Sequence, residues 1–437
     1  MGARETALNV LIACRKEAGW SNGVLKDYIS RDRLDKRDAA LATRLCYGVV
    51  QNRGLLDFYL GQLLTGKLKD LHPAVRDILH MGLYQIYLMD KIPESAAVNE
   101  SVDLAKKYCR KVRSAPGLVN GVLRNAVRTK GSLKEPKSWE DQYSHPGDLI
   151  NELKSYVGKE RMEKMLQANN DIPPMVVQVN TLRITAQELT AMLEDAGITV
   201  QPHSWMPDAL ILSGTGSIEQ LDAFQKGLFY VQDPASKLSV LCAQLPKEKI
   251  KILDCCAAPG GKSFAAAMAT DGKASIISCD VYAHKAELIA KGAQRLGISL
   301  DARQQDATVF NPDWEAAFDA VIVDAPCSGY GIIRKKPDIR YKDISQMKQL
   351  PELQRAILEV QCRYVKPGGL LTYSTCTLAC GENEGMVEAF LKDHPEFYLE
   401  PLPLPHVFPK NETGMQALIP GQYDTDGFFI SRLRRIV

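Results

Sequence analysis

The chain of 437 residues lacks the patterns that mark several large classes of protein. It has no uninterrupted apolar run near the length that a membrane-spanning helix needs, and no signal-peptide core follows Met1. Its 11 cysteines are odd in number and scattered, and none of them forms a CxxC motif. We therefore expect no disulfide framework, no structural zinc site, no membrane association and a reducing, cytoplasmic setting.

Charge is unevenly distributed along the chain. The formal net charge is +2, yet the first 130 residues contain a clear excess of Lys and Arg over Asp and Glu, so the remainder is acidic. A basic region of this size favours a phosphate-bearing partner such as nucleic acid. The alternative is an ordinary solvated helical surface.

The first 130 residues are predicted to form an all-helical bundle. Apolar residues recur at spacings of three and four, as in Val75, Ile78, Leu79 and Leu83. Breaks are predicted at 19–23, 72–73 and 92–93. The polar segment 131–147 is interpreted as a linker, and short alternating elements over 148–235 indicate a small α+β module.

Residues 236–437 alternate strand-like runs with helical patterns. Strands are expected at 250–254, 275–279, 320–323 and 370–373, a short strand is expected before Asp306, and a last strand at 427–433. Helices are expected at 263–269, 284–296, 351–365 and 383–393. This alternation predicts a parallel, doubly wound sheet, and hence a C-terminal α/β domain.

A glycine loop and three acids follow successive predicted strands. The loop 258–262 follows the first strand, which ends at Asp254; Asp280 ends the second, and Asp306 follows the third. Ligands bind at this edge of an open sheet, where a carboxylate can accept ribose hydroxyls. Walker A is excluded because its first glycine would fall at Cys256, and GxGxxG is absent. These features favour S-adenosylmethionine over a dinucleotide.

Two cysteines follow the next two strands, Cys327 in Asp324-Ala325-Pro326-Cys327 and Cys376 in Ser374-Thr375-Cys376. Both are expected to face one cavity. Thiolates are strong nucleophiles, and methylation of carbon 5 of a pyrimidine is the foremost reaction that uses two. One thiol attacks carbon 6, the other assists release, and Asp324, if protonated or sharing a proton, stabilises charge at ring nitrogen 3.

Two further patterns lie near these cysteines. The loop after Cys327 contains four cations, Arg334, Lys335, Lys336 and Arg340, which we interpret as contacts to nucleic-acid phosphates. A metal site at Cys376 and Cys380 is discounted because no histidine is near.

The motifs, in this order, resemble the Fmu/Sun family of RNA cytosine-5 methyltransferases. The resemblance is carried by residues 230–236, 254–262, 324–328, 331–334, 374–376 and 426–429. The N-terminal helices are similar to the NusB fold, notably at 45–50 and 98–102. The resemblance implies a NusB-like bundle, an α+β module and a Rossmann-like methyltransferase domain over 236–437.

The resemblance also implies roles for individual residues. Cys376 corresponds to the nucleophile of the RNA enzymes and Cys327 to the cysteine of product release; DNA cytosine-5 methyltransferases use the Pro-Cys cysteine for attack, and the residues alone leave the choice open. The implied cofactor contacts are Cys256, Ala257, Ala258, Pro259, Gly260, Gly261, Lys262, Asp280, Asp306 and Asp324.

The NusB-like module points to small-subunit (16S) ribosomal RNA as the substrate. We expect a monomer that uses S-adenosylmethionine, holds RNA with the bundle (1–130) and the α+β module (148–235), and contains no metal. Two alternatives stay open. One is a tRNA cytosine-5 methyltransferase, and the other is a non-catalytic RNA-binding or antitermination factor, which would need neither thiol.

Overall fold

The computed structural model describes residues 1–16 and 22–436 and divides into two compact units. One unit contains residues 1–151 and 336–342, and the other contains 152–335 and 343–437. The break predicted at 19–23 lies mostly outside the described residues. Within the described part, no helix is both long and apolar enough to cross a membrane.

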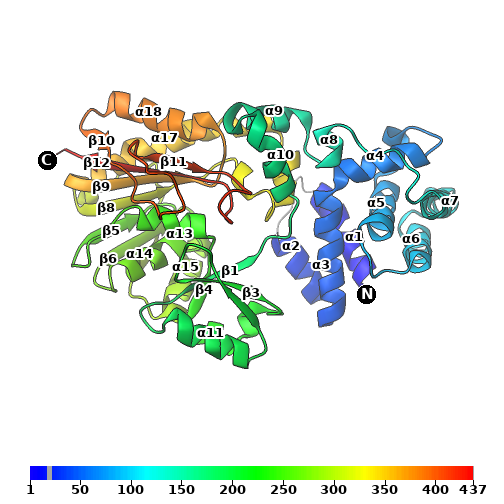
Figure 1. Cartoon of the computed structure of the whole chain (residues 1–437), viewed down its shortest axis with the longest axis horizontal. Helices are drawn as coiled ribbons and strands as arrows, with labels where there is room; N and C mark the ends of the chain where they lie inside the picture. The colour runs from blue at the N-terminus through cyan, green and yellow to red at the C-terminus, as the bar shows by residue number, and fades with distance from the viewer. Residues whose placement is uncertain (17–21, 437) are drawn as a thin grey trace. The chain divides into compact units, whose positions relative to one another are not determined.

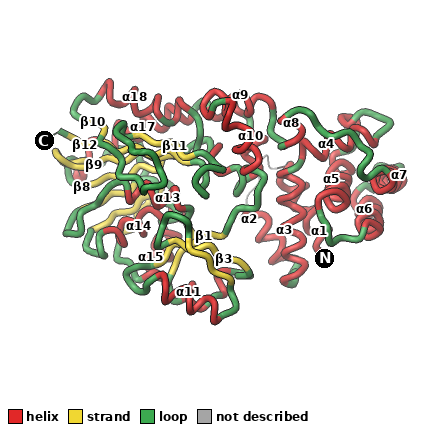
Figure 2. The backbone as a smooth tube through the Cα atoms, viewed as in Figure 1, coloured by secondary structure: helices red, strands yellow, loops and turns green. Residues whose placement is uncertain are grey.

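The first unit is a helical bundle (Figures 1 and 2). Asp35 caps its third helix by accepting the backbone N–H of Asp38, and Pro73 begins its fifth, where a missing N–H costs nothing. Its main helices are α1 (Ala3–Lys16), α2 (Asn22–Arg31), α3 (Lys36–Gln51), α4 (Arg53–Leu63), α5 (Pro73–Leu88), α6 (Glu94–Tyr108) and α7 (Ala115–Arg128).

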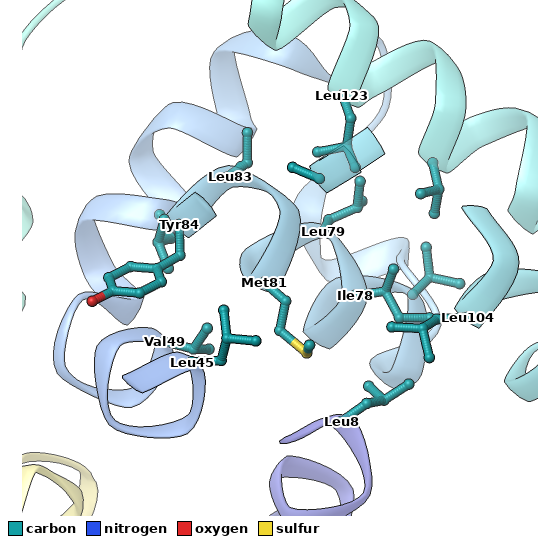
Figure 3. Close-up of a cluster of buried hydrophobic side chains, with 14 of the residues drawn as sticks. Leu8, Leu45, Val49, Ile78, Leu79, Met81, Leu83, Tyr84, Leu104 and Leu123 are labelled. Carbon is teal, nitrogen blue, oxygen red and sulfur yellow. The ribbon is translucent and has the colours of Figure 1, made fainter. Parts of the chain in front are cut away.

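Helix α5 is the centre of this bundle, because apolar side chains cover it on nearly every side. Figure 3 shows its residues Ile78, Leu79 and Met81 among side chains from neighbouring helices. Close approach depends on a glycine of α3: a Cβ at Gly48 would lie 2.0 Å from the ring of Tyr84.

The segment 131–147, which the sequence suggests is a linker, is bonded to the bundle. It contains the short helix α8 (Trp139–Gln142). The hydroxyl of Tyr59 in α4 donates to Glu135, and the Ser144 hydroxyl accepts the N–H of Leu55. The 3-10 helix η5 (Pro337–Tyr341) belongs to the same unit.

The second unit includes the small α+β module. Its four strands pair in the order β2-β3-β1-β4, antiparallel throughout. Thr185 and Glu188 form a capping box at the start of its helix α11. The elements are α9 (Gly147–Val157, beginning in the first unit), α10 (Lys159–Ala168), β1 (Met175–Val179), α11 (Ala186–Asp195), β2 (Thr199–Pro202), β3 (Ala209–Ser213), α12 (Asp222–Gln225) and β4 (Phe229–Val231).

The larger sheet of this unit has eight strands, with β10-β12-β9-β8-β5-β6-β7 in order and β11 paired to β12. The strands are β5 (Lys251–Asp254), β6 (Ser275–Asp280), β7 (Asp301–Gln304), β8 (Phe318–Asp324), β9 (Val365–Thr375), β10 (Phe397–Leu399), β11 (Met415–Leu418) and β12 (Phe428–Arg435). The helices are α13 (Pro234–Leu241), α14 (Gly261–Ala269), α15 (Ala283–Leu296), α16 (Ile344–Met347), α17 (Leu350–Gln361) and α18 (Glu384–Asp393).

The sheet is the middle of three layers. Figure 1 shows α17 and α18 on one face and α13, α14 and α15 on the other, and each face has its own apolar core. The predicted multidomain fold is therefore confirmed, including each predicted strand of the parallel sheet. The sheet is nevertheless mixed, because β12 returns antiparallel to β9 and pairs with β10 and β11.

Candidate active site at the carboxyl edge of the sheet

The candidate site lies where β5, β6, β8 and β9 end. Strand β5 neighbours β6 on one side and β8 on the other, so the chain reverses its direction of winding at β5. This is the position at which open α/β sheets bind ligands. All the residues described in the next paragraphs, up to the cationic loop, belong to the second unit.

The glycine loop joins β5 to α14. Gly260 has φ of +108°, a backbone conformation that side chains disfavour, and it precedes the first residue of the helix. A Cβ on Gly261 would lie 2.9 Å from the side-chain nitrogen of Gln232. The loop therefore needs glycine at position 260, whereas a side chain at position 261 would require Gln232 to move.

Asp254 differs from the other acids because it is fully buried. Its Oδ2 accepts the hydroxyl of Ser263 at 2.7 Å, and the Ser278 hydroxyl donates to Ser263 Oγ at 2.8 Å. Oδ1 is buried without a partner. Burial raises the pKa of Asp254 to about 7.

Asp280 and Asp306 lie at the ends of neighbouring strands, as the sequence predicts. Asp280 Oδ1 accepts the backbone N–H of Tyr282 at 3.2 Å. Asp306 Oδ1 accepts the N–H and hydroxyl of Thr308. A carboxylate at the end of the second strand suits ribose hydroxyls. The residues present therefore fit a nucleoside cofactor.

Lys262, predicted as a cofactor contact, is directed to Asp324 at the end of β8. Its Nζ lies 2.6 Å from Asp324 Oδ2 and donates to the Ser236 hydroxyl at 2.9 Å. The ammonium also lies over the Phe428 ring, 4.9 Å from its centroid. Asp324 Oδ1 accepts the hydroxyl of Ser374 at 3.0 Å. The pair therefore joins the glycine loop to both thiol-bearing strands.

The sulfurs of Cys327 and Cys376 lie 3.3 Å apart. The described residues include all 11 cysteines, each of them a free thiol, and these two are half-buried. The hydrogen bond with Cys376 raises the pKa of Cys327, and burial adds to the effect. Cys327 is therefore protonated at neutral pH, and either of the two thiols can donate the hydrogen bond between them.

Residues that sequence reasoning missed support this thiol pair. The Glu382 carboxylate accepts from Ser328, next to Cys327, while Ser328 and Thr377, next to Cys376, share a hydroxyl contact of 2.5 Å. Asn383 donates to the backbone oxygen of Thr377 at 3.1 Å. The signal in the sequence is the polar segment Gly381-Glu382-Asn383-Glu384 directly before a helix that is partly apolar.

The four predicted phosphate contacts do not share one environment. Arg334 and Lys335 form ion pairs with Asp426, and Lys335 lies 2.8 Å from Asp233. Lys336 and Arg340 belong to the first unit, where Lys336 is exposed.

Arg340 is 2% exposed and donates to the backbone oxygens of Gln51 and Tyr143. Burial lowers the pKa of Arg340 to about 10. The sequence predicts Arg340 as a phosphate contact, whereas in the structure its side chain is buried and bonded to backbone oxygens. Charge runs read from sequence do not show such burial.

Comparison with protein families gives three matches along the chain. Residues 1–128 match the NusB family, residues 145–219 match the RsmF/B-like ferredoxin-like domain, and residues 242–434 match the family described as 16S rRNA methyltransferase RsmB/F. The fold and the site thus define an S-adenosylmethionine-dependent methyltransferase.

Similar proteins cover nearly the whole chain. "Probable ribosomal RNA small subunit methyltransferase B" of Bacillus subtilis is 36% identical, covering 99% of this chain and 98% of its own. Ribosomal RNA small subunit methyltransferase B of Vibrio cholerae is 35% identical, and the match covers 93% of this chain and 92% of that protein. The crystal structure of PH0851 matches with a TM-score of 0.82 and 25% identity, and the match covers 100% of this chain and 99% of the PH0851 chain. The chain belongs to the ribosomal RNA small subunit methyltransferase B family.

Proposed function

We propose that this protein methylates carbon 5 of a specific cytosine in small-subunit (16S) ribosomal RNA through a covalent bond between Cys376 and carbon 6. The observation that carries the proposal is the 3.3 Å separation of the Cys327 and Cys376 sulfurs beside the Lys262–Asp324 ion pair. A protein that only binds RNA needs neither thiol.

The first step uses Cys376 as a nucleophile. Its thiolate attacks carbon 6, and the ring electrons move toward carbon 5 and nitrogen 3. The thiol of Cys327 can donate a hydrogen bond to that thiolate before attack, which agrees with the raised pKa of Cys327. Asp324 shares a short contact with Lys262, so a proton of this pair can stabilise the charge that develops at nitrogen 3.

S-adenosylmethionine, when bound, supplies an electrophilic methyl group. We assign its binding to the loop 256–262 and to the carboxylates of Asp280, Asp306 and Asp324. We assign the Lys262 side chain mainly to pairing with Asp324 and to contact with the target base, because its ammonium lies beside Asp324.

Release uses Cys327 as a base. Once the Cys376 sulfur is bonded to carbon 6, it no longer accepts a hydrogen bond as a thiolate. The hydrogen bond with Cys376, which is the largest cause of the raised Cys327 pKa, is then lost, and Cys327 gives up its proton to solvent. Its thiolate takes the proton from carbon 5, the electron pair restores the double bond to carbon 6, and the Cys376 sulfur leaves.

The RNA is assigned to the NusB-family bundle and the ferredoxin-like module. The target base must be unstacked to reach sulfurs at a strand end, so a loop or an incompletely folded RNA suits the site. Lys336 contributes an exposed cation to phosphate binding in this proposal.

The test is transfer of labelled methyl from S-adenosylmethionine to unmodified 16S rRNA, followed by digestion to nucleosides. Label in 5-methylcytidine supports both reaction and substrate. Label only with tRNA would leave the chemistry and overturn the substrate. The absence of label on any RNA, together with no measurable cofactor binding, would favour the RNA-binding factor.

A further inference from the structure

Glu382 is a buried carboxylate between the two thiol-bearing loops. It is 5% exposed and precedes α18. Within residues 1–16 and 22–436, no ion pair involves Glu382. A buried acid without a cation is costly unless hydrogen bonds compensate it.

Three donors converge on this carboxylate. Oε2 accepts the backbone N–H of Ser328 at 3.0 Å and the amide of Gln354 at 2.8 Å, and Oε1 accepts the Ser328 hydroxyl at 2.6 Å. Only an acceptor with two oxygens can receive all three at once. The same Gln354 amide also donates to the backbone oxygen of Pro326 at 2.9 Å, so the loop is bonded on both sides of Cys327.

Glu382 is also linked to the Cys376 loop and its strand, through Ser328 and through its own backbone oxygen. Ser328 Oγ contacts Thr377 Oγ1 at 2.5 Å, and the backbone oxygen of Glu382 accepts the Tyr373 hydroxyl from β9 at 2.7 Å. The Glu382 carboxylate therefore holds Ser328, the residue after Cys327, and the Ser328 hydroxyl in turn contacts Thr377, the residue after Cys376.

We propose that Glu382 is a positioning residue that, through its bonds to Ser328 and Gln354, fixes the Cys327 and Cys376 sulfurs against each other and holds a carboxylate beside the Cys327 loop. The charge of Glu382 contributes to the raised pKa of Cys327, after the Cys376 hydrogen bond and burial. This inference rests on the proposed function for its kinetic consequence, whereas its effect on the thiols stands without it.

Two substitutions separate geometry from charge. In E382Q the amide oxygen can keep the bonds from Ser328 N–H and Gln354, and the amide nitrogen can donate to Ser328 Oγ, which then donates to Thr377. E382A removes the three bonds that the Glu382 side chain makes with Ser328 and Gln354. Glu388 of α18, the helix that follows Glu382, is exposed, so E388A is the matched control.

The thiols are measured first in the full-length protein, without RNA. Alkylation of Cys327 by iodoacetamide is followed by peptide mass spectrometry across pH, and diamide oxidation reports how readily the two sulfurs form a disulfide. We expect E382Q to alkylate about tenfold faster at neutral pH, since a nearby buried charge is removed. We expect E382A to form the disulfide more slowly than wild type and E388A.

Methylation is measured second. Misplacing reacting groups by about 1 Å can cost about a hundredfold, so E382A should lose about that factor in kcat with little change in KM for RNA. E382Q should retain more activity, with a shifted pH profile. Identical thiol reactivity, disulfide formation and kcat in E382A, E382Q and E388A would overturn the proposal. If wild type makes no 5-methylcytidine, the proposed function fails while the thiol measurements still decide the role of Glu382.

Discussion

The Nζ of Lys262 lies 2.6 Å from Oδ2 of Asp324, although the two residues are 62 positions apart, one in the first turn of α14 and the other at the end of β8. Lys262 is 6% and Asp324 31% exposed in their side chains, so the pair is partly shielded from water. Such a pair can deliver a proton or charge to a substrate with little reorganisation. In the proposed function, the backbone of the glycine loop is assigned to the cofactor and the Lys262 side chain to the base.

The first prediction concerns Lys262. K262M keeps the length and apolar stem of the side chain but removes its charge, so Asp324 loses its cation. We expect kcat for RNA methylation to fall about a hundredfold, because one preorganised charge at the base is lost. Calorimetry should show cofactor affinity changed only a few-fold. Lys291, exposed on α15, is the control as K291M. Loss of cofactor binding with kcat preserved would instead support the cofactor contact implied by the resemblance.

The second prediction separates the two thiols. C376A should abolish methylation, because the carbon 6 nucleophile is lost. C327A should still attack and then accumulate a covalent protein–RNA complex, because no base frees the enzyme. A denaturing gel with labelled RNA measures the complex. C380A is the control, since Cys380 is an exposed thiol four residues from Cys376. Substantial turnover by C376A, or a trapped complex in C376A and none in C327A, would reverse the roles.

The closeness of the two thiols could be predicted from sequence, because each cysteine directly follows the end of a strand. Adjacent parallel strands end at the same edge, so Cys327 after β8 and Cys376 after β9 are neighbours once the order of strands is known. The same reasoning predicts the positions of Asp280 and Asp306. Strands that are recognised from their apolar pattern are enough to predict where these residues lie, because each residue directly follows a strand of the sheet.

The direction of Lys262, the burial of Arg340 and the bonds of Glu382 could not be predicted in this way. Each depends on a loop side chain and on a partner far away in sequence: Asp324, the carbonyl oxygen of Gln51, and Ser328, respectively. Hydrophobic patterns carry no information about such pairs. The antiparallel return of β12 was also not evident, because a strand-like run does not show its direction.

The third prediction tests the packing of the bundle. In G48A the added methyl would overlap the ring of Tyr84, which lies in the buried core of the bundle. We expect the free energy of unfolding to fall by about 1–3 kcal/mol from overpacking. G61A is the matched control, because Gly61 is exposed in α4 and its Cβ meets nothing within 4 Å. Alanine should stabilise that helix by up to about 1 kcal/mol. Thermal unfolding measures the stability of both variants. Equal changes in the unfolding midpoint of G48A and G61A relative to wild type would contradict the prediction.

The fourth prediction concerns pH and Asp254. Burial raises the pKa of Asp254 to about 7, from an ordinary value of 3.8. Between these values the folded protein holds a proton that the unfolded chain has lost, so its contribution to stability declines as pH rises through that window. D254N has no such proton. Its stability relative to wild type should therefore improve from pH 5 to pH 7, by at most about 1.4 kcal/mol per pH unit, and then level off.

Thermal midpoints of D254N and wild type at pH 5, 6, 7 and 8 measure this difference, because pH effects of the other groups cancel between the two proteins. D313N is the control, since Asp313 is exposed and its variant should follow wild type at every pH. A constant difference between D254N and wild type from pH 5 to pH 8 would mean that Asp254 stays ionised in the folded protein. The Ser263 hydroxyl and the nearby Lys262 charge, which both lower the pKa of Asp254, would then outweigh its burial.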